Sequence, residues 1–324
     1  MAKYWIRVLA ASLACSSAGV ITLGVPATAA PKSGAWSKTQ SIEVRDRSSI
    51  SVVSCASATL CAAVDNGGDV HFWKNGTWSA PEHLNAGGSL SSISCPTTTF
   101  CVATGGEAVA YNGRTWHEVG SLSSRDIYQI SCPTTTFCAA TGASGLPGKP
   151  SSLAVFNGHT WSVQNTVSTG KVSDRVLDVS CASATYCVAV NWNGKILMYD
   201  GSRWATLTKV GPPGLISVSC VSESFCLALS DKGRSIVVHD DTWSDERNIP
   251  SLAAAFAYSV SCSTARECLA IGLDGRSAAW LDGAWLKART VFAGGFVSGV
   301  NVSCTPTQCM AINAKDKSSL FRWS

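Results

Sequence analysis

The chain repeats one pattern of apolar and polar positions, and that pattern predicts short β-strands. In the copy over residues 48–84, "SISVVSC" alternates β-branched and polar residues, and "ASATL" follows as a turn. "CAAVDNGG" and "DVHFWKNG" are further apolar runs that end in glycine turns, and "TWSAPEHL" is a fourth strand segment. Asn-Gly and Asp-Gly between apolar runs favour hairpins, because both residues tolerate positive φ. Each copy therefore predicts four antiparallel strands.

A close pair of cysteines marks each copy. The segment "SCPTTTFC" occurs twice, at 94–101 and 131–138, and looser copies of this Ser-Cys-x5-Cys frame recur along the chain. The pairs are Cys55/Cys61, Cys95/Cys101, Cys132/Cys138, Cys181/Cys187, Cys220/Cys226, Cys262/Cys268 and the shorter Cys304/Cys309. Their first cysteines lie 37 to 49 residues apart, and a period in this range indicates a repeat architecture. Four short antiparallel strands per period are typical of a β-propeller blade, so the sequence predicts an all-β, seven-bladed propeller.

The positions of tryptophan predict how the ring closes. A Trp occupies the fourth strand of each copy, at positions 36, 78, 116, 161, 204, 243 and 285. The first of these precedes the first cysteine pair, whereas the chain ends on a third-strand segment, residues 320–323. We therefore expect the N-terminal strand, which carries Trp36, to pair beside residues 320–323 and complete the last blade. This pairing would remove an open sheet edge.

The first thirty residues differ from the repeats. Lys3 and Arg7 form a basic start, residues 8–25 are almost wholly apolar or small, and Ala27-Thr28-Ala29 offers a cleavage site. This is typical of a secretory signal peptide, and we expect cleavage after Ala29, which leaves one propeller domain over residues 30–324. A membrane anchor is the alternative. A lipoprotein is disfavoured because Leu13 lies two residues before Cys15 rather than three. No other segment is long and apolar enough to span a bilayer.

The cysteine count indicates an oxidising compartment. Of 15 cysteines, Cys15 would leave with the signal peptide, and the remaining fourteen form the close pairs. An even set of pairs behind an export signal predicts disulfides in a secreted, extracellular protein. Zinc is the alternative, but zinc sites place two to four residues between ligands, and the five histidines share no frame with the pairs. We expect no metal and no cofactor.

Composition excludes one class of partner. Charged residues are 14% of the chain, and without Lys3 and Arg7 the 25 basic residues fall to 23, against 21 acidic ones. Nucleic-acid binding needs a strong basic stripe, which is absent from this sequence.

The cysteine frame also carries a family resemblance. With its Ser-Cys-x5-Cys-x-Ala frame, the chain resembles the secreted seven-bladed β-propellers of actinobacteria, which are loosely related in architecture to sialidase-like propellers. The resemblance covers nearly the whole chain after the first thirty residues. It implies secretion and a binding role rather than a particular reaction.

Propellers usually bind ligands on the face where the inter-blade connectors and the turns between strands two and three emerge. The candidate ligand-binding residues on these connectors are Arg47, Arg125, Asp126, Tyr128, Asp174, Arg175, Glu246 and Arg247. Arginine offers bidentate geometry for carboxylate, sulfate or phosphate, although charged loops also serve solubility. The turn at residues 142–151 is longer than its counterparts, and it either shapes a pocket or is a tolerated loop.

A second candidate set lies three residues before each first cysteine. These positions hold Val52, Ser92, Gln129, Asp178, Ser217, Ser259 and Asn301, of which only the first is apolar. On the innermost strands they would form a ring that lines the central channel, with Asp178 as the only charge. The alternative is a hydrated wall that binds nothing.

Catalytic motifs are not evident. The sequence has no His-Glu-x-x-His, no Gly-x-Ser-x-Gly, no phosphate loop and no dinucleotide fingerprint, so any catalytic residues are unknown. We predict a secreted, monomeric propeller that binds an extracellular ligand, and we expect this ligand to be a glycan or cell-envelope polymer. One alternative is a glycosidase- or lyase-type enzyme, in which Asp126 and Glu246 would converge within about 5–10 Å. The other is an extracellular protein-interaction scaffold.

Overall fold

The computed structural model describes residues 34–45, 48–120, 126–143, 152–164, 175–207, 211–239, 242–252, 257–293, 299–315 and 318–323. Residues 31–324 form one compact unit. Within the described ranges every regular element is a β-strand, and no helix is present that has the length and hydropathy needed to cross a bilayer. The predicted signal peptide lies outside the described residues.

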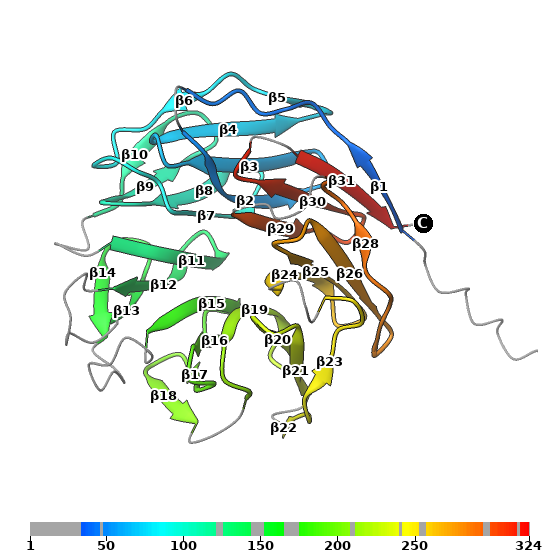
Figure 1. The fold of residues 1–324 in the computed structure, drawn as a ribbon. Helices are drawn as coiled ribbons and strands as arrows, with labels where there is room; N and C mark the ends of the chain where they lie inside the picture. The colour runs from blue at the N-terminus through cyan, green and yellow to red at the C-terminus, as the bar shows by residue number, and fades with distance from the viewer. Residues whose placement is uncertain are drawn as a thin grey trace, which may run out of the picture. The chain divides into compact units, whose positions relative to one another are not determined.

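The strands assemble into seven antiparallel sheets, each of which runs outward from an innermost first strand (Figure 1). The first strands are β2 (Ile50–Ser57), β7 (Ser92–Thr97), β11 (Asp126–Thr134), β15 (Val176–Ser183), β19 (Leu215–Ser222), β24 (Ala257–Thr264) and β29 (Val300–Cys304). The second strands are β3 (Leu60–Asp65), β8 (Phe100–Thr104), β12 (Phe137–Ala143), β16 (Tyr186–Asn191), β20 (Phe225–Ser230), β25 (Glu267–Gly272) and β30 (Gln308–Asn313).

The outer strands complete each sheet. The third strands are β4 (Asp69–Lys74), β9 (Ala108–Tyr111), β13 (Ser152–Phe156), β17 (Ile196–Tyr199), β21 (Arg234–His239), β26 (Arg276–Leu281) and β31 (Ser318–Trp323). The fourth strands are β5 (Thr77–Trp78), β10 (Trp116–Glu118), β14 (Trp161–Gln164), β18 (Trp204–Leu207), β22 (Thr242–Trp243), β27 (Ala284–Trp285) and β1 (Gly34–Lys38). Three short strands, β6 (Glu82–His83), β23 (Arg247–Asn248) and β28 (Arg289–Thr290), pair with the third strands of their sheets.

The first strands contact one another in a closed circle. Each first strand lies beside the first strand of the next sheet, and β29 lies beside β2. The sheets are therefore the blades of a propeller, and the prediction of an all-β propeller with four-stranded antiparallel blades is confirmed. The apolar clusters lie between neighbouring blades, where side chains of adjacent sheets interdigitate.

All of the predicted cysteine pairs are disulfide-bonded, and each bond joins the first and second strands of one blade across their shared hairpin. Cys55, for example, lies directly opposite Cys61 in the register of β2 and β3. Facing positions of an antiparallel pair bring the two sulfur atoms within bonding distance, which is why a hairpin of this length suits a disulfide. The bonds are Cys55–Cys61, Cys95–Cys101, Cys132–Cys138, Cys181–Cys187, Cys220–Cys226, Cys262–Cys268 and Cys304–Cys309.

The second cysteine of each pair is buried, which limits what the pairs can do. These cysteines lie on the second strands, inside the sheets, and each is at most 1% exposed: Cys61, Cys101, Cys138, Cys187, Cys226, Cys268 and Cys309. A side chain without exposed surface cannot contact a ligand. The second cysteines are therefore structural residues that stabilise the blades.

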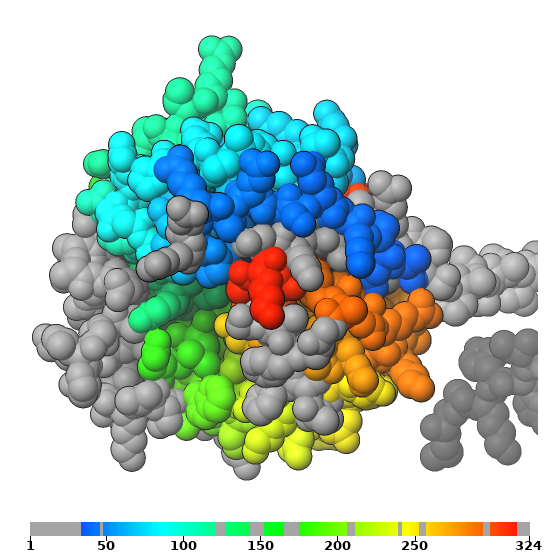
Figure 2. Space-filling model, turned by 45° about the horizontal axis from the view of Figure 1, so that its top comes forward, coloured from blue at the N-terminus to red at the C-terminus, as the bar shows by residue number. Residues whose placement is uncertain are grey.

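The N-terminal strand closes the last blade, as predicted. β1 pairs antiparallel with β31, with Gly34 opposite Trp323 and Lys38 opposite Ser319. The Nε1–H of Trp36 donates to Ser277 Oγ of the preceding blade at 2.8 Å. In Figure 2 the blue N-terminal segment accordingly lies against the orange blade of β26–β28.

The Asn-Gly and Asp-Gly corners have two different geometries. Asn75 and Asp282 adopt positive φ in two-residue turns between strands three and four. At Asn112, Asn157 and Asp200 the loop has four residues, and the Asx side-chain oxygen accepts backbone N–H bonds from residues two and three positions on. The strand-four Trp follows the Asx residue by three positions in the first group and by four in the second, so this spacing distinguishes the turns.

Candidate functional site

The serine of each Ser-Cys frame joins one blade to the next. Its hydroxyl oxygen accepts a hydrogen bond from the backbone N–H of the first cysteine in the following blade. The circle runs from Ser54–Cys95 through Ser94–Cys132, Ser131–Cys181, Ser180–Cys220, Ser219–Cys262 and Ser261–Cys304 to Ser303–Cys55, at 2.9–3.0 Å. This role was missed from the sequence, although the serine is present in every copy of the frame.

We expect loss of one such hydroxyl to weaken the ring measurably. In Ser180→Ala, the N–H of the buried Cys220 loses its acceptor, and an unsatisfied buried donor costs about 1–3 kcal/mol. Urea unfolding of oxidised protein would measure the change, with Ser224→Ala on an exposed turn as the matched control. Equal stability of the two variants would contradict the role of this hydrogen bond.

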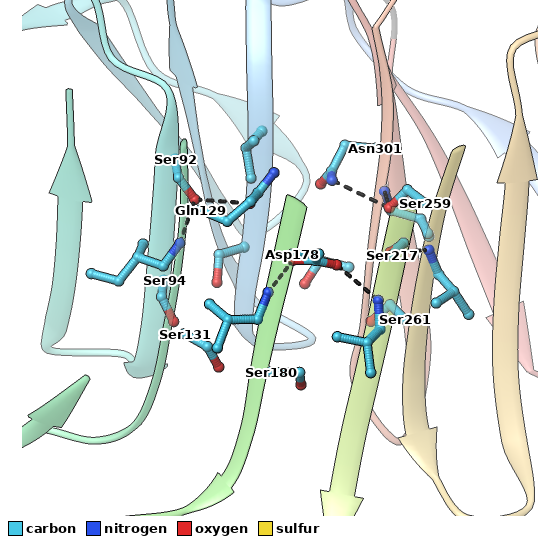
Figure 3. A pocket seen from close by; sticks show the side chains of 18 of the residues that line it. Ser92, Ser94, Gln129, Ser131, Asp178, Ser180, Ser217, Ser259, Ser261 and Asn301 are labelled. Atoms are coloured by element: carbon cyan, nitrogen blue, oxygen red, sulfur yellow. Dashed lines mark hydrogen bonds between the residues drawn. The ribbon is translucent and has the colours of Figure 1, made fainter. Parts of the chain in front are cut away.

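The ring of residues three positions before the first cysteines lines a central cavity, as predicted. The cavity has a volume of about 450 Å³, and all of the predicted ring positions contribute to its wall. Figure 3 shows Ser92, Gln129, Asp178, Ser217, Ser259 and Asn301 directed into the space between the first strands.

Most of these polar groups also hold neighbouring blades together. Ser92, Ser217 and Ser259 each accept a backbone N–H bond from the next blade, at 3.2–3.4 Å. Asn301 Oδ1 accepts from Val53 N–H at 3.1 Å, across the closure of the ring. Val52 has no polar side-chain atom with which to continue this series. The ring is therefore a structural wall, part of whose hydrogen-bonding capacity is already used.

Asp178 is the only charged side chain among the described residues that line the cavity. Its Oδ1 accepts from Val179 N–H at 2.8 Å, and its Oδ2 accepts from Val218 N–H at 2.9 Å. Burial raises the pKa of Asp178 from its ordinary value of 3.8 to about 7, against the opposing effect of the hydrogen bonds from Val218, Ser217 and Val179. Near neutral pH this carboxyl group therefore changes charge in response to small changes in its surroundings.

The raised pKa of Asp178 predicts a pH-dependent stability. An unfolded Asp titrates near 3.9, so between about pH 4 and pH 7 the folded protein binds more protons at this group than the unfolded chain. Stability contributed by this group is therefore lost as pH rises through that window. Relative to Asp178→Asn, which does not titrate, the wild type should lose about 2–3 kcal/mol of unfolding free energy between pH 5 and pH 8. Urea unfolding at both pH values tests this, and a constant difference would refute it.

Bulged residues lie at the start of several first strands, and three of them line the cavity, at the part of its wall that we call its mouth. The strand register shifts at Ser51, Tyr128, Leu177, Ile216 and Tyr258, each one residue before the polar ring. A β-bulge changes the direction of its side chain, so that it need not alternate with its neighbour. Leu177, Ile216 and Tyr258 accordingly line the same cavity as the ring residues that follow them.

Trp192, from the turn between β16 and β17, joins these residues at the cavity. We call Leu177, Trp192, Ile216 and Tyr258 the apolar crescent. Trp192 is 44% exposed and Tyr258 is 47% exposed, so both present aromatic surface beside the cavity. The crescent therefore places apolar surface beside a polar, partly charged cavity.

Two of the predicted connector candidates meet near this mouth. Tyr128 occupies in β11 the position that Leu177 occupies in β15, and it is 36% exposed. The Arg175 guanidinium lies 5.1 Å from the centre of the Tyr128 ring, which is cation–π distance. These two residues contact each other, and their role in ligand binding stays a prediction.

Other candidates lie elsewhere or outside the described residues. Glu246 forms an exposed ion pair with Arg234 at 2.8 Å. Arg247 donates to Gly283 O at 2.8 Å and lies 5.6 Å from the centre of the Trp280 ring, in a separate groove between two blades. These two residues do not line the cavity. Outside the described residues are Arg47, Arg125, Asp174, the Asp126 side chain and most of the long turn (144–151).

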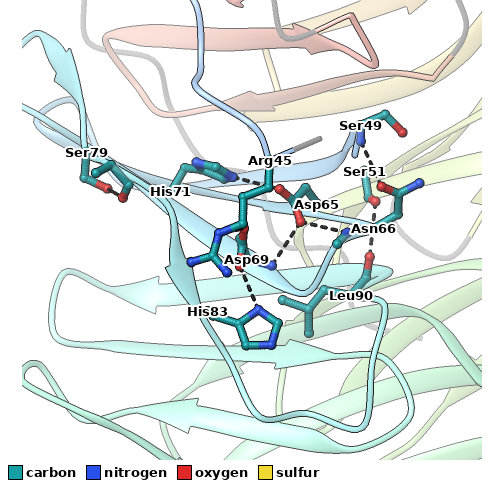
Figure 4. Close-up of polar contacts among 12 residues, drawn as sticks. Arg45, Ser49, Ser51, Asp65, Asn66, Asp69, His71, Ser79, His83 and Leu90 are labelled. Carbon is teal, nitrogen blue, oxygen red and sulfur yellow. Dashed lines mark hydrogen bonds and ion pairs between the residues drawn. The ribbon is translucent and has the colours of Figure 1, made fainter. Parts of the chain in front are cut away.

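A second polar cluster lies in the first blade (Figure 4). Asp65 Oδ2 lies 3.1 Å from the buried His71 Nε2, while Asp69 contacts His83 Nδ1 at 2.8 Å and Arg45 Nε at 3.0 Å. Burial opposes ionisation of Asp65, but hydrogen bonds from His71 and from backbone N–H groups hold its pKa below the ordinary value. These contacts fix the turn between β3 and β4 to its flanking connectors, which gives both histidines a structural role.

The described residues contain no group of three or more His, Cys, Asp or Glu side chains placed to hold a metal ion. No protein-family model matches the chain, and no curated protein matches it either. The actinobacterial resemblance therefore stays a prediction.

Solved structures match the fold closely. One is described as the WD40 β-propeller domain of Doa1, with a TM-score of 0.69 at 11% identity, covering 88% of this chain and 96% of that one. Another is described as YCF48 bound to D1 peptide, with a TM-score of 0.64 at 13% identity, covering 93% of this chain and 99% of that one. At these identities the similarity establishes the propeller fold, which often serves as a binding scaffold.

Proposed function

We propose that this seven-bladed propeller binds an extracellular glycan or cell-envelope polymer at the mouth of its central cavity. The observation that carries the proposal is the apolar crescent beside a polar wall. Sugar rings have apolar faces and polar edges, so they are complementary to a Trp or Tyr ring next to hydroxyl, amide and carboxyl groups. Binding sites of this kind combine aromatic contact surface with a few polar groups that fix orientation.

The cysteines support the extracellular part of the proposal. A disulfide in every blade is consistent with an extracellular protein, because such bonds persist in oxidising compartments. We propose that residues 1–29 direct secretion and that the mature protein is a monomer beginning at Ala30. N-terminal sequencing and size-exclusion chromatography of protein from culture medium would test both statements.

A peptide or protein partner is the second candidate. Tyr, Trp and Arg side chains are enriched at protein interfaces. Trp192 and Tyr258 line this cavity, and Arg175 stacks on the exposed Tyr128. The similar propeller YCF48 has been solved with a peptide bound. An enzyme is less well supported, because glycosidases of the common type need two carboxylates, whereas the described cavity wall supplies only Asp178.

The proposed function predicts that aromatic truncation abolishes most binding. The oxidised protein is screened against a glycan array and isolated cell-wall polymers, and the best ligand is titrated into Trp192→Ala and Tyr258→Ala. Loss of a stacked ring should weaken binding about tenfold, which corresponds to about 1.4 kcal/mol. Leu286→Ala is the control, because Leu286 is also exposed (41%) but does not line the cavity.

The outcomes separate the candidates. Confined hits that are lost in the two aromatic variants and retained in Leu286→Ala support the proposal. An array without hits, or binding that survives both aromatic substitutions, overturns it. A peptide display library that gives hits at the same mouth would then favour the second candidate.

A further inference from the structure

We propose that the ligand of this cavity is a glycan with a free amino group, and that Asp178 binds the ammonium group beneath the apolar crescent. This inference rests on the proposed function and names the substrate class of the same site. It is carried by the position of a single carboxyl group in an otherwise uncharged, partly aromatic cavity.

The first argument is the charge balance of the cavity. Asp178 is partly buried and accepts hydrogen bonds from Val179, Ser217 and Val218. No Lys or Arg is among the described residues that line the wall, and Arg175 lies outside this lining, where it stacks on Tyr128. A carboxylate removed from water without a cationic partner is unfavourable, and a positive ligand group would remove that penalty. The other ring positions of the wall are neutral, so the preference would be specific to the blade of β15.

The second argument is hydrogen-bonding capacity. Each oxygen of the Asp178 carboxylate accepts one backbone N–H bond, from Val179 and Val218. The Ser217 hydroxyl supplies a third hydrogen bond to this carboxyl group. An ionised carboxylate has about four acceptor positions, so about one position remains for a ligand donor. An ammonium group can donate one of its three N–H bonds to that position. The two backbone bonds also fix the carboxylate in place before the ligand arrives.

The third argument concerns the aromatic rings. Trp192 and Tyr258 line the same cavity as Asp178, and the faces of Trp and Tyr attract cations through their ring quadrupoles. The rings would contact both the apolar face of a sugar and its ammonium substituent. A divalent metal ion fits less well, because it needs several oxygen ligands and the cavity wall offers one carboxylate.

Net charge does not produce this preference. Without Lys3 and Arg7 the chain still has 23 basic against 21 acidic residues, so its average field does not attract cationic ligands. Preference for a cationic over a neutral sugar would therefore come from the local site.

The test compares two oligosaccharides with one backbone, the β-1,4-linked tetramers of glucosamine and of N-acetylglucosamine. Each is titrated calorimetrically into oxidised wild type and Asp178→Asn at pH 5.5, where the free amines are charged. We expect wild type to bind the amine tetramer at least tenfold more tightly than the acetylated one. Asp178→Asn should bind the two within about twofold, and circular dichroism confirms that it is folded.

A second readout is independent of the variant's affinity. Since Asp178 is mostly protonated in the free protein at pH 5.5, binding of an ammonium group should release a proton. Titration of wild type in two buffers of different ionisation enthalpy measures this release. We expect up to one proton per site with the amine tetramer and none with the acetylated tetramer or with Asp178→Asn.

The outcomes also separate this inference from the proposed function. If wild type binds both tetramers equally, or prefers the acetylated one without proton release, the amine inference fails and the glycan function stands. If neither tetramer nor any other glycan binds, both fail. If a tetralysine peptide binds with proton release and no sugar binds, the glycan inference is overturned in favour of a basic peptide.

Discussion

Reduction of the disulfides should unfold the protein at temperatures at which the oxidised form is stable. Each bond closes a loop with a sequence separation of 5 or 6 residues, for which the chain-entropy model gives about 2 kcal/mol. The seven bonds together then contribute about 14 kcal/mol, near the upper end of the roughly 5–15 kcal/mol by which a typical domain is stable. The reduced chain is expected to lose its cooperative thermal transition or to melt tens of degrees lower.

The measurement must allow for the burial of the sulfur atoms. The second cysteine of every pair is buried, as in Cys101, Cys268 and Cys309, so its sulfur atom is shielded from reductant while the chain is folded. The protein is therefore unfolded in urea with a phosphine reductant, returned to native buffer with or without reductant, and followed by circular dichroism. Mass spectrometry of trapped thiols confirms the redox state. A fully reduced sample that melts within about 5 °C of the oxidised one would contradict the prediction.

A single-blade variant gives the control. Cys181→Ala together with Cys187→Ala removes one bond and leaves six in place. We expect it to stay folded and to lose about 2–4 kcal/mol, from the loop entropy and from the buried volume of Cys187. If the loss of this one disulfide prevented folding, the stability of the whole ring would depend on a single blade.

Features that recur in every blade could be predicted from the sequence. The cysteine frame predicted the hairpin and its disulfide, because the two cysteines of each bond lie within one short segment. The sequence also predicted the strand pair that closes the ring. Trp36 has no third strand before it, and the segment Leu320–Trp323 has no fourth strand after it, so the two complete each other. The aromatic pairs of strands three and four follow the same rule, with ring centroids 5.3 Å apart for Tyr111 and Trp116.

Features that depend on a neighbouring blade could not be predicted in the same way. The serine of the Ser-Cys frame was visible in every copy, but its partner lies about forty residues away in the next blade. A local pattern does not reveal which backbone N–H a side chain will meet. Likewise, the buried His71 occupies a strand-three position that is apolar in Val109, Leu197 and Ile236, and only the structure supplies the partner, Asp65, that makes it tolerable.

The candidate site illustrates the same limit. Asp178 was predicted to line the channel from its position in the repeat, and this is correct. The apolar crescent was missed, because a bulge adds one residue to a strand and the periodicity of two then assigns its side chain to the wrong face. Trp192 belongs to a turn that no repeat rule describes. The residues that make the mouth distinctive are thus those that depart from the repeat.

Removal of β1 should open the ring and cost the protein about 3 kcal/mol or more. A chain that starts at Thr39 lacks Gly34–Lys38 and leaves β31 as an unpaired edge. It also loses Trp36, which packs on an apolar cluster of the last two blades and donates to Ser277. Truncation of a core Trp costs about 3–5 kcal/mol, and the partly buried Trp36 should contribute toward the lower end of that range. The exposed edge should in addition promote association, which size-exclusion chromatography would detect.

Complementation in trans makes this prediction specific to strand pairing. A synthetic peptide of residues 30–40 should bind the shortened chain, restore most of its melting temperature and suppress its association, because it can re-form the β1–β31 ladder. The same peptide with Trp36→Ala is the control and should rescue less, since it keeps the backbone pairing and loses the side-chain contacts with the preceding blade. If the shortened chain is as stable as the longer one, the N-terminal strand contributes nothing to the unfolding free energy and the prediction is wrong. If both peptides rescue equally, closure depends on backbone hydrogen bonds and not on Trp36.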